Sequence, residues 1–312
     1  MKIFLAGATG ALGRQLVPTL RAAGHEVAGT TRSAAKADEL RKAGAEPVVL
    51  DALDAAAVRD AVVAARPDVV IHQLTAISEP NFKDLDTAFA ATNRLRTEGL
   101  DHLLTAAHSA GAKRFIAQSF TGWPNERTGG ALKTEDDRLD PNPAKNSEHT
   151  LAAIRHVESA VAAADGIEGV VLRYGAFYGP GTDLGPGGSM LEMVRKRQLP
   201  LVGGGAGVFS FIHIADAATA TVAAVENGAP GIYNIVDDEP ATVATWLPYL
   251  AEAIGAKPPR RLPAWLVKPM IGEFGVNMMT ATRGSSNAKA RRELGWTPAY
   301  PSWREGFATL AQ

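Results

Sequence analysis

The sequence predicts an α/β fold built on a parallel sheet. Over the first 120 residues, short β-branched or aliphatic segments alternate with longer alanine-rich segments of helical period, which is typical of parallel βαβ units. Continuous apolar runs such as Asp68-Val-Val-Ile71 suit strands that are covered on both faces. A glycine-rich turn follows the first strand-like segment directly. These three observations favour a dinucleotide-binding type of α/β protein over a bundle or an all-β domain.

The elements can be proposed in chain order. Strands are expected at 2–6, 26–30, 46–50, 68–73 and 113–118, each followed by a polar or glycine-rich break and a helix. Pro18 falls inside the first predicted helix, beyond the turn where proline is tolerated, and predicts a kink or a restart there. A long helix is expected at about 81–110.

The second half has a looser pattern. Residues 119–146 are polar and rich in glycine and proline, which predicts a long loop over the site. A helix follows at about 147–164, with strand-like segments at 168–173 and 208–214. The segment 179–205 is glycine-rich around one helix, and short helices separated by prolines follow residue 240.

Composition excludes several classes of function. Hydrophobic residues make up 46% and charged residues 21% of the 312, with a net charge of −1, so neither disorder nor a nucleic-acid partner is expected. The chain has no cysteine, which excludes disulfides, thiolate nucleophiles and cysteine-ligated zinc. The apolar run at the N-terminus ends at Gly7 and is too short for a signal peptide or a membrane span. We therefore expect a cytoplasmic protein without a membrane partner.

The glycine turn reads Gly7-Ala-Thr-Gly10-Ala-Leu-Gly13 and lies between the first strand and the first helix. In this order of elements, backbone amides and the helix N-terminus can bind a pyrophosphate. Gly7 and Gly10 permit a tight turn and close approach, and Gly13 permits close packing of helix and strand. The residues assigned to the cofactor here are Gly7, Thr9, Gly10, Ala11, Leu12 and Gly13.

The end of the second predicted strand bears on the choice of cofactor. NAD sites commonly place an acidic residue there for the ribose hydroxyls, but this chain reads Gly29-Thr-Thr-Arg32-Ser-Ala-Ala-Lys36. Arg32 and Lys36 could bind a ribose 2′-phosphate, so NADP is expected rather than NAD. Asp51, with Ala52 beside it, follows the third strand and could accept a hydrogen bond from the adenine amino group.

Further motifs follow in a characteristic order. They are Ile71-His-Gln-Leu-Thr-Ala76, Leu172-Arg-Tyr-Gly-Ala-Phe-Tyr-Gly-Pro180, Phe211-Ile-His-Ile-Ala-Asp216, Tyr233-Asn-Ile-Val236 and Leu294-Gly-Trp296. With the glycine turn, they make the chain resemble the extended short-chain dehydrogenases/reductases, which include nucleotide-sugar epimerases, dehydratases and reductases. The resemblance implies a Rossmann-type, doubly wound parallel sheet with a smaller C-terminal substrate lobe. Residues 1–178 and 208–237 would form the dinucleotide domain, and 179–207 and 238–312 the lobe.

The resemblance also implies roles for individual residues. Leu74, Thr75 and Ala76 would line the cofactor, Asn93 would support the middle of the site, and Gln118 would lie beside it. Tyr174, Gly175 and Ala176 would lie near the nicotinamide. His213 and Asp216 would be structural.

The acid–base pair of these enzymes is missing. The family has a tyrosine and, four residues later, a lysine on one helix face, where the ammonium lowers the pKa of the phenol. Aligning Glu158 with the usual glutamate places Thr150 at the tyrosine and Ile154 at the lysine. The candidate replacements are Ser119, Thr121 and His149, followed by Glu148, Tyr174 and Tyr178. We expect no metal, because no third ligand accompanies His149 and His156.

These features predict an NADP(H)-dependent oxidoreductase or an epimerase/dehydratase-like enzyme. Its substrate would be a small carbonyl, alcohol or sugar-like molecule, and Phe120, Trp123 and Phe177 could make the pocket more apolar. The alternative is a non-catalytic, NADP-sensing regulatory protein, which the loss of the acid–base pair favours. The helices at 81–110 and 147–164 could pair with a second copy in a homodimer.

Overall fold

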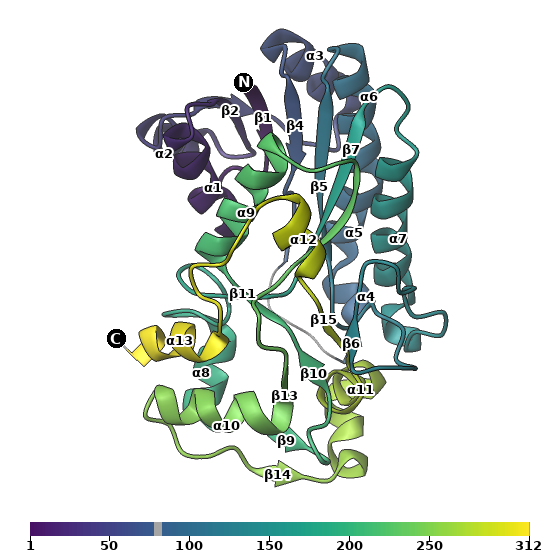
Figure 1. Ribbon diagram of the computed structural model, residues 1–312, viewed down its shortest axis with the longest axis vertical. Coiled ribbons are helices and arrows are strands. Elements are labelled where there is room, and N and C mark those ends of the chain that lie inside the picture. The colour runs from purple at the N-terminus through teal and green to yellow at the C-terminus, as the bar shows by residue number, and fades with distance from the viewer. Residues whose placement is uncertain (78–82, 312) are drawn as a thin grey trace.

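The computed structural model describes residues 1–77 and 83–311 and contains a seven-stranded parallel sheet in the order β12-β7-β5-β4-β1-β2-β3. The sheet occupies the upper half of Figure 1. Chain order reverses between β1 and β4, which brings the carboxyl ends of these strands to a switch point where α/β sheets bind ligands. The strands are β1 (Lys2–Ala6), β2 (Glu26–Thr31), β3 (Glu46–Val49), β4 (Val69–His72), β5 (Arg114–Phe120), β7 (Glu168–Tyr174) and β12 (Gly231–Ile235).

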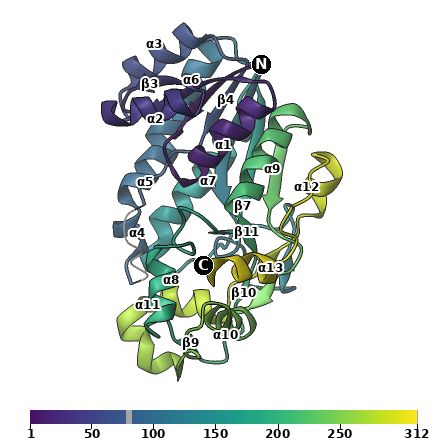
Figure 2. The same ribbon diagram turned by 90° about the vertical axis from the view of Figure 1, so that its left-hand side faces the viewer.

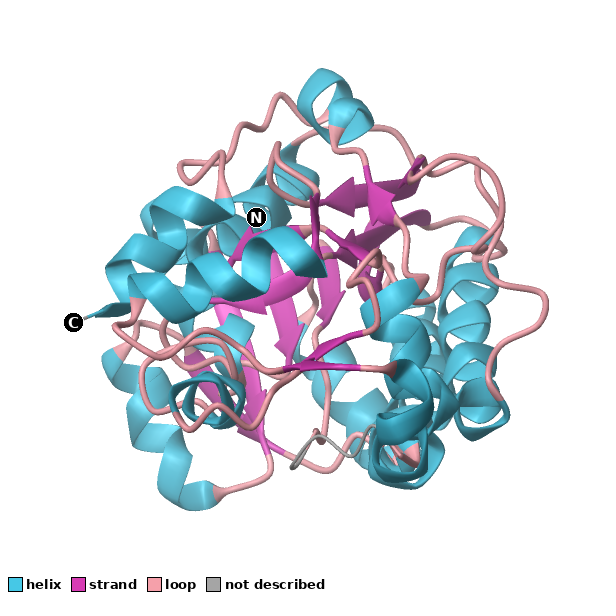
Figure 3. Cartoon of the chain, turned by 90° about the horizontal axis from the view of Figure 1, so that it is seen from below, coloured by secondary structure: helices cyan, strands magenta, loops and turns pink. Residues whose placement is uncertain are grey.

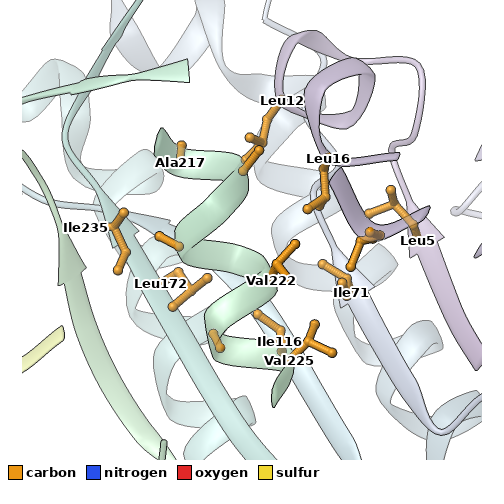
Figure 4. Packing of buried hydrophobic residues seen from close by; sticks show 14 of the residues in the cluster. Leu5, Leu12, Leu16, Ile71, Ile116, Leu172, Ala217, Val222, Val225 and Ile235 are labelled. Carbon is orange, nitrogen blue, oxygen red and sulfur yellow. The ribbon is translucent and has the colours of Figure 1, made fainter. Parts of the chain in front are cut away.

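Helices cover both faces of the sheet. On one face, α1 and α9 pack on Leu5, Ile71 and Ile116, because each helix presents an aliphatic stripe to the strands (Figure 4). On the other face, α3, α6 and α7 bury Val62, Leu103 and other aliphatic residues. These helices are α1 (Ala11–Ala22), α3 (Ala55–Ala65), α6 (Leu100–Ser109), α7 (Glu148–Ala162) and α9 (Ile214–Glu226), with the short α2 (Ala37–Lys42) between β2 and β3.

A second core lies below the carboxyl ends of the strands in Figures 1 and 2. Its centre is aromatic, with Trp246, Trp303 and Phe211 buried together. This region contains short two-stranded sheets, and Figure 3 shows it from below. The helices here are α8 (Ser189–Arg195), α10 (Val243–Ala253), α11 (Ala264–Thr280) and α13 (Trp303–Ala308); the short strands are β6 (Leu132–Lys133), β8 (Ala176–Tyr178), β9 (Leu201–Val202), β10 (Val208–Phe209), β11 (Phe211–His213), β13 (Ala241–Thr242), β14 (Arg261–Leu262) and β15 (Gly284–Ser285). The short α12 (Ala288–Glu293) packs instead against β12, and its Ala290 belongs to the core of the sheet.

Several sequence expectations need correction. The helix expected at 81–110 is interrupted: α4 (Leu85–Ala88) and α5 (Ala90–Arg94) meet at Phe89, and a π-helical turn (Leu95–Gly99) precedes α6. Residues 81 and 82 of that prediction lie outside the described residues. Pro18 does not divide α1, which runs through it as one helix. The strand expected at 208–214 is two short strands, and Ile214 already begins α9. The loop expected at 119–146 contains the short β6, which pairs with β15.

Within the described ranges, no helix combines the length and the apolar composition needed to cross a membrane. The proposed domain boundaries and the homodimer stay predictions.

Candidate active site

The glycine turn forms a cradle open to an anion. Gly7 has a φ of +96°, and a Cβ there would lie 2.6 Å from the carbonyl oxygen of Gln73. A Cβ on Gly13 would lie 2.3 Å from the carbonyl oxygen of Gly7. No side chain of the described chain caps α1 at Gly10, so the first-turn amides are available to a ligand. The turn therefore fits a dinucleotide pyrophosphate, with Thr9, Gly10 and Ala11 reaching the surface and Leu12 packed into the core.

The ends of β2 and β3 present the residues expected at the adenosine. Arg32 is exposed and Lys36 half-buried, and neither forms an ion pair with another described residue. Asp51 is exposed, and its Oδ1 accepts a hydrogen bond from the backbone amide of Leu53 at 3.0 Å. Ala52 is buried beside it. Positive charge without an acidic residue is thus present where β2 ends.

The segment after β4 is tied to the helix that carries Asn93. The backbone amide of Ala76 donates to Thr92 Oγ1 at 3.0 Å, which holds Leu74, Thr75 and Ala76 against α5. The next residue, Asn93, donates through its Nδ2 to Thr150 Oγ1 at 3.1 Å. The structure therefore brings the ends of β4, α5 and α7 together, as the assignment of Asn93 to the middle of the site requires.

Thr150 and Ile154, at the positions of the missing acid–base pair, are both buried. Thr150 is fully buried, and its Oγ1 donates to Asp86 Oδ1 at 2.6 Å. The same carboxylate accepts the backbone amides of His149 and Thr150, so it caps α7. Ile154 is also buried. Asp86 has no motif around it, and sequence reasoning missed it because its partner is 64 residues away.

Ser119 and Thr121 belong to separate buried networks. Ser119 Oγ donates to Glu158 Oε1 at 2.8 Å, and Glu158 pairs with Arg173 through two bonds of 2.7 Å. Thr121 Oγ1 shares a hydrogen bond of 2.5 Å with Ser285 Oγ, and Asn125 Nδ2 donates to both hydroxyl oxygens.

His149 lies apart from both hydroxyl networks. It is exposed, and its backbone amide donates to Asp86 Oδ2 at 3.0 Å. No hydrogen bond between described residues joins Ser119, Thr121 and His149, so the structure does not assemble these three candidates into one catalytic group.

The tyrosine candidates are core residues. Tyr174 is buried, and its hydroxyl bonds with Thr221 Oγ1 at 2.6 Å and accepts Gln73 Nε2 at 3.1 Å. Burial raises the pKa of both Tyr174 and Tyr178, which opposes proton transfer near neutrality. The placement of Tyr174 near the nicotinamide stays a prediction, and its buried, doubly bonded hydroxyl does not suit a proton donor.

The neighbours of Tyr174 are placed by backbone packing. Gly175 lies where a Cβ would be 2.6 Å from the carbonyl oxygen of Ser210, Ala176 is half-buried, and Gln118 is a buried residue of β5. His213 and Asp216, for which structural roles are expected, make packing contacts: the His213 ring lies against Tyr300 with centroids 4.1 Å apart and ring planes tilted by 33°, and Asp216 accepts two backbone amides.

A small cavity, with room for about one water molecule, lies beside the N-terminus of α7. Trp123 and Phe274 form one wall, with ring centroids 5.1 Å apart and the rings edge to face, and Met278 extends it. Arg127 and Asp140 also line the cavity and pair with each other at 2.8 Å. Trp123 was expected near the site, but the α11 residues were not, because nothing in their sequence marks them. Among the described residues, no group of histidine and acidic side chains could hold a metal.

Comparison of the sequence with known proteins identifies the family to which the chain belongs. The family described as "NAD dependent epimerase/dehydratase family" matches residues 3–236. A Streptomyces protein named 3-diazoavenalumate denitrifying reductase is 47% identical, over 98% of this chain and 99% of its own.

Solved structures share the fold. UDP-glucose 4-epimerase of Thermotoga maritima, solved with UDP-glucose, superposes with a TM-score of 0.77 at 22% identity, over 100% of this chain and 97% of its own. The human epimerase family protein SDR39U1, solved with NADPH, gives 0.76 at 20%, over 100% and 99%. With the glycine cradle, the strand order and the family match in agreement, the chain belongs to the NAD-dependent epimerase/dehydratase family and is built to bind a nicotinamide dinucleotide.

Proposed function

We propose that the protein is an NADPH-dependent reductase of a small aromatic substrate, and that the group reduced is a diazo group. One observation carries the proposal. At the two positions where the family has its catalytic tyrosine and lysine, this chain has a threonine whose hydroxyl is bonded to Asp86 and a buried isoleucine. Thr150 donates its only hydroxyl proton to Asp86, and Ile154 has no proton to give. The site therefore suits a reduction that needs no proton donor.

Carbonyl reduction and diazo reduction differ in this respect. A bound nicotinamide dinucleotide supplies hydride in either case. A ketone that accepts hydride must also gain a proton on oxygen, which is the task of a general acid. An aryl diazonium group that accepts hydride on its terminal nitrogen becomes an aryl diazene. The diazene loses N₂ and keeps its hydrogen on the ring carbon, so no further proton is consumed.

The 47%-identical relative supports this choice, because its name describes the denitrifying reduction of a diazo compound. The aromatic wall of Trp123 and Phe274 supports a flat, ring-bearing substrate. For the cofactor, the exposed Arg32 and half-buried Lys36 support NADPH, because their charges suit a 2′-phosphate. We also propose that the protein acts on free small molecules and forms a homodimer, which sedimentation equilibrium would test.

The chemistry is tested by NADPH oxidation with two matched acceptors, diazotised 3-aminobenzoate and 3-carboxybenzaldehyde. We expect oxidation with the diazo compound, together with one N₂ released per NADPH, and little with the aldehyde. Turnover of the aldehyde alone would return the protein to carbonyl chemistry. Tight cofactor binding without turnover of either acceptor would favour the NADP-sensing alternative.

The cofactor is tested by titration calorimetry with NADPH and NADH. Arg32→Ala should weaken NADPH binding by roughly 10-fold or more and leave NADH binding unchanged, because a charged hydrogen bond contributes about 1.5–3 kcal/mol. Arg59→Ala is the matched control, since Arg59 is an exposed cation paired with Asp60 far from β2's end. Equal losses for NADPH and NADH would contradict the assignment.

A further inference from the structure

Arg96 is a buried arginine that has no ion-pair or hydrogen-bond partner among the described residues. It is 5% exposed, and no described residue forms an ion pair or a hydrogen bond with its side chain. Its Nε and Nη1 atoms are both shielded from solvent and unpaired. Buried charges are almost always paired, because desolvation of an isolated ion is strongly unfavourable. Burial lowers the pKa of Arg96 to about 10, so the group is still charged at neutral pH.

The guanidinium reaches back along its own helical segment to Phe89. Arg96 lies in the π-helical turn Leu95–Gly99, and its guanidinium carbon is 5.8 Å from the ring centroid of Phe89, seven residues earlier. A helical side chain that leans towards the N-terminus in this way passes the level of Asn93, three residues before it on the same face. Asn93 is the residue that bonds Thr150. π-helical turns of this kind are frequent at functional sites.

A second observation places the charge at the end of β4. His72, the last residue of β4, shares a hydrogen bond of 3.0 Å between its Nε2 and the carbonyl oxygen of Leu95. Burial first, and the charge of Arg96 in addition, lower the pKa of His72 to about 4. His72 Nδ1 and Asn93 Oδ1 are buried polar atoms that also lack partners. Unpaired atoms of this kind are rare, and here they belong to a residue on which the charge of Arg96 acts and to one that precedes Arg96 by three positions.

The aromatic wall of the cavity adjoins this cation. Phe89, which contacts the guanidinium, packs against the cluster of Leu85, Ala144 and Phe274. Phe274 and Ala144 in turn line the cavity. Phe89 therefore contacts both the buried cation and the cluster that contains Phe274.

We propose that Arg96 binds an anionic oxygen of the substrate, either a carboxylate or a phenolate on an aromatic ring, and so makes the enzyme selective for anionic aromatic compounds. The guanidinium is suited to both groups because it offers parallel donors in a fixed plane. The phosphates of a dinucleotide are not its partner, since backbone amides at Gly7–Gly13 are placed for them. The inference rests on the proposed function only for the reaction, because recognition of the anion can be measured by binding alone.

The kinetic test uses the variants Arg96→Met and Arg96→Lys, with Arg94→Met as the control. Arg94 is a suitable control because it is exposed and paired with Glu98. Three diazotised substrates are compared: 3-amino-4-hydroxybenzoate, its methyl ester and 3-aminobenzoate. Arg96→Met should raise KM by roughly 10- to 100-fold for every substrate that keeps the recognised anion, with a smaller rise for Arg96→Lys and none for Arg94→Met. If the methyl ester is unaffected, the recognised group is the carboxylate; if 3-aminobenzoate is unaffected, it is the phenolate.

Two results would overturn the inference. Unchanged KM values for all three substrates in Arg96→Met would show that the charge does not meet the substrate. A weakened NADPH affinity with unchanged KM would assign Arg96 to the cofactor.

A binding experiment separates this inference from the proposed function. Cinnamate and neutral cinnamamide are titrated into the NADP⁺-loaded protein. We expect wild type to prefer cinnamate by roughly 10-fold or more and Arg96→Met to bind the two alike. If this preference appears while no diazo compound is reduced, the proposed reaction is wrong and the anion site stands. The anion site is wrong if two results are found together. Wild type would bind cinnamate and cinnamamide equally, and Arg96→Met would leave KM unchanged for diazotised 3-amino-4-hydroxybenzoate and diazotised 3-aminobenzoate.

Discussion

Arg96→Met should stabilise the ligand-free protein, although it removes a large buried side chain. Burial lowers the pKa of Arg96 from 12.5 to about 10. At about 1.4 kcal/mol per pKa unit, this shift means that the charged group costs the folded state about 3 kcal/mol. The sign follows from the depressed pKa of a cationic group: the cost is fully present below pH 10 and declines as the pH rises above the folded pKa.

Methionine removes this cost and keeps most of the apolar stem. Allowing about 1 kcal/mol for imperfect filling, the net gain is about 1–2 kcal/mol. An unfolding entropy of about 2.1 cal/mol/K per residue over 312 residues converts this gain to a rise in Tm of about 2–3 °C. Differential scanning calorimetry without ligand measures it at neutral pH. Arg94→Met, at an exposed pair on the same segment, should change Tm by less than about 1 °C. A fall in Tm for Arg96→Met would refute the description of Arg96 as an unpaired buried charge.

Three further variants test other parts of the structure. Glu158→Gln leaves the buried Arg173 without its carboxylate and should cost about 3–5 kcal/mol in a urea titration, whereas a loss below 1 kcal/mol would contradict a buried ion pair. Burial raises the pKa of Asp237 to about 8, so the folded state holds a proton that the unfolded state releases above about pH 4, and stability falls as pH rises from about 4 to 8. Asp237→Asn should flatten this decline, and an unchanged pH profile would argue against it. Gly13→Ala should abolish NADPH binding in calorimetry, because its Cβ would overlap the backbone of Gly7; retained affinity would contradict the tight cradle.

The fold was largely predictable because its signals are local. A parallel strand that is covered on both faces is usually an unbroken apolar run, and β4 could be predicted from Val69, Val70 and Ile71 in this way. The interruption at Phe89 was not predictable, since no proline or glycine marks it and the helix around it keeps its apolar period. The short edge strand β12 was seen only as a motif, because its partner β7 lies some 60 residues earlier in the chain.

The candidate site also contains residues that could be predicted from the sequence and residues that could not. Gly7 and Gly13 could be predicted, because only glycine fits where a Cβ would overlap backbone. The capping of Thr150 by Asp86 could not, because it depends on a loop and a helix meeting in space. Arg96 interrupts the apolar side of the predicted helix, but the sequence could not show that its charge is buried, because that depends on the elements packed around it.

The hydrogen bond between Thr121 and Ser285 has a consequence for the time course of biosynthesis. It joins the end of β5 to β15 across 164 residues, and Ser285 also accepts Asn125 and receives Ser210 at its carbonyl. During synthesis on the ribosome, strands β1 to β7 of the sheet can pair before Ser285 has been synthesised. Until then Thr121 and Asn125 lack their partner, so this edge of the site is completed last, and folding of the C-terminal region is the step that converts an early dinucleotide-binding core into a finished active site.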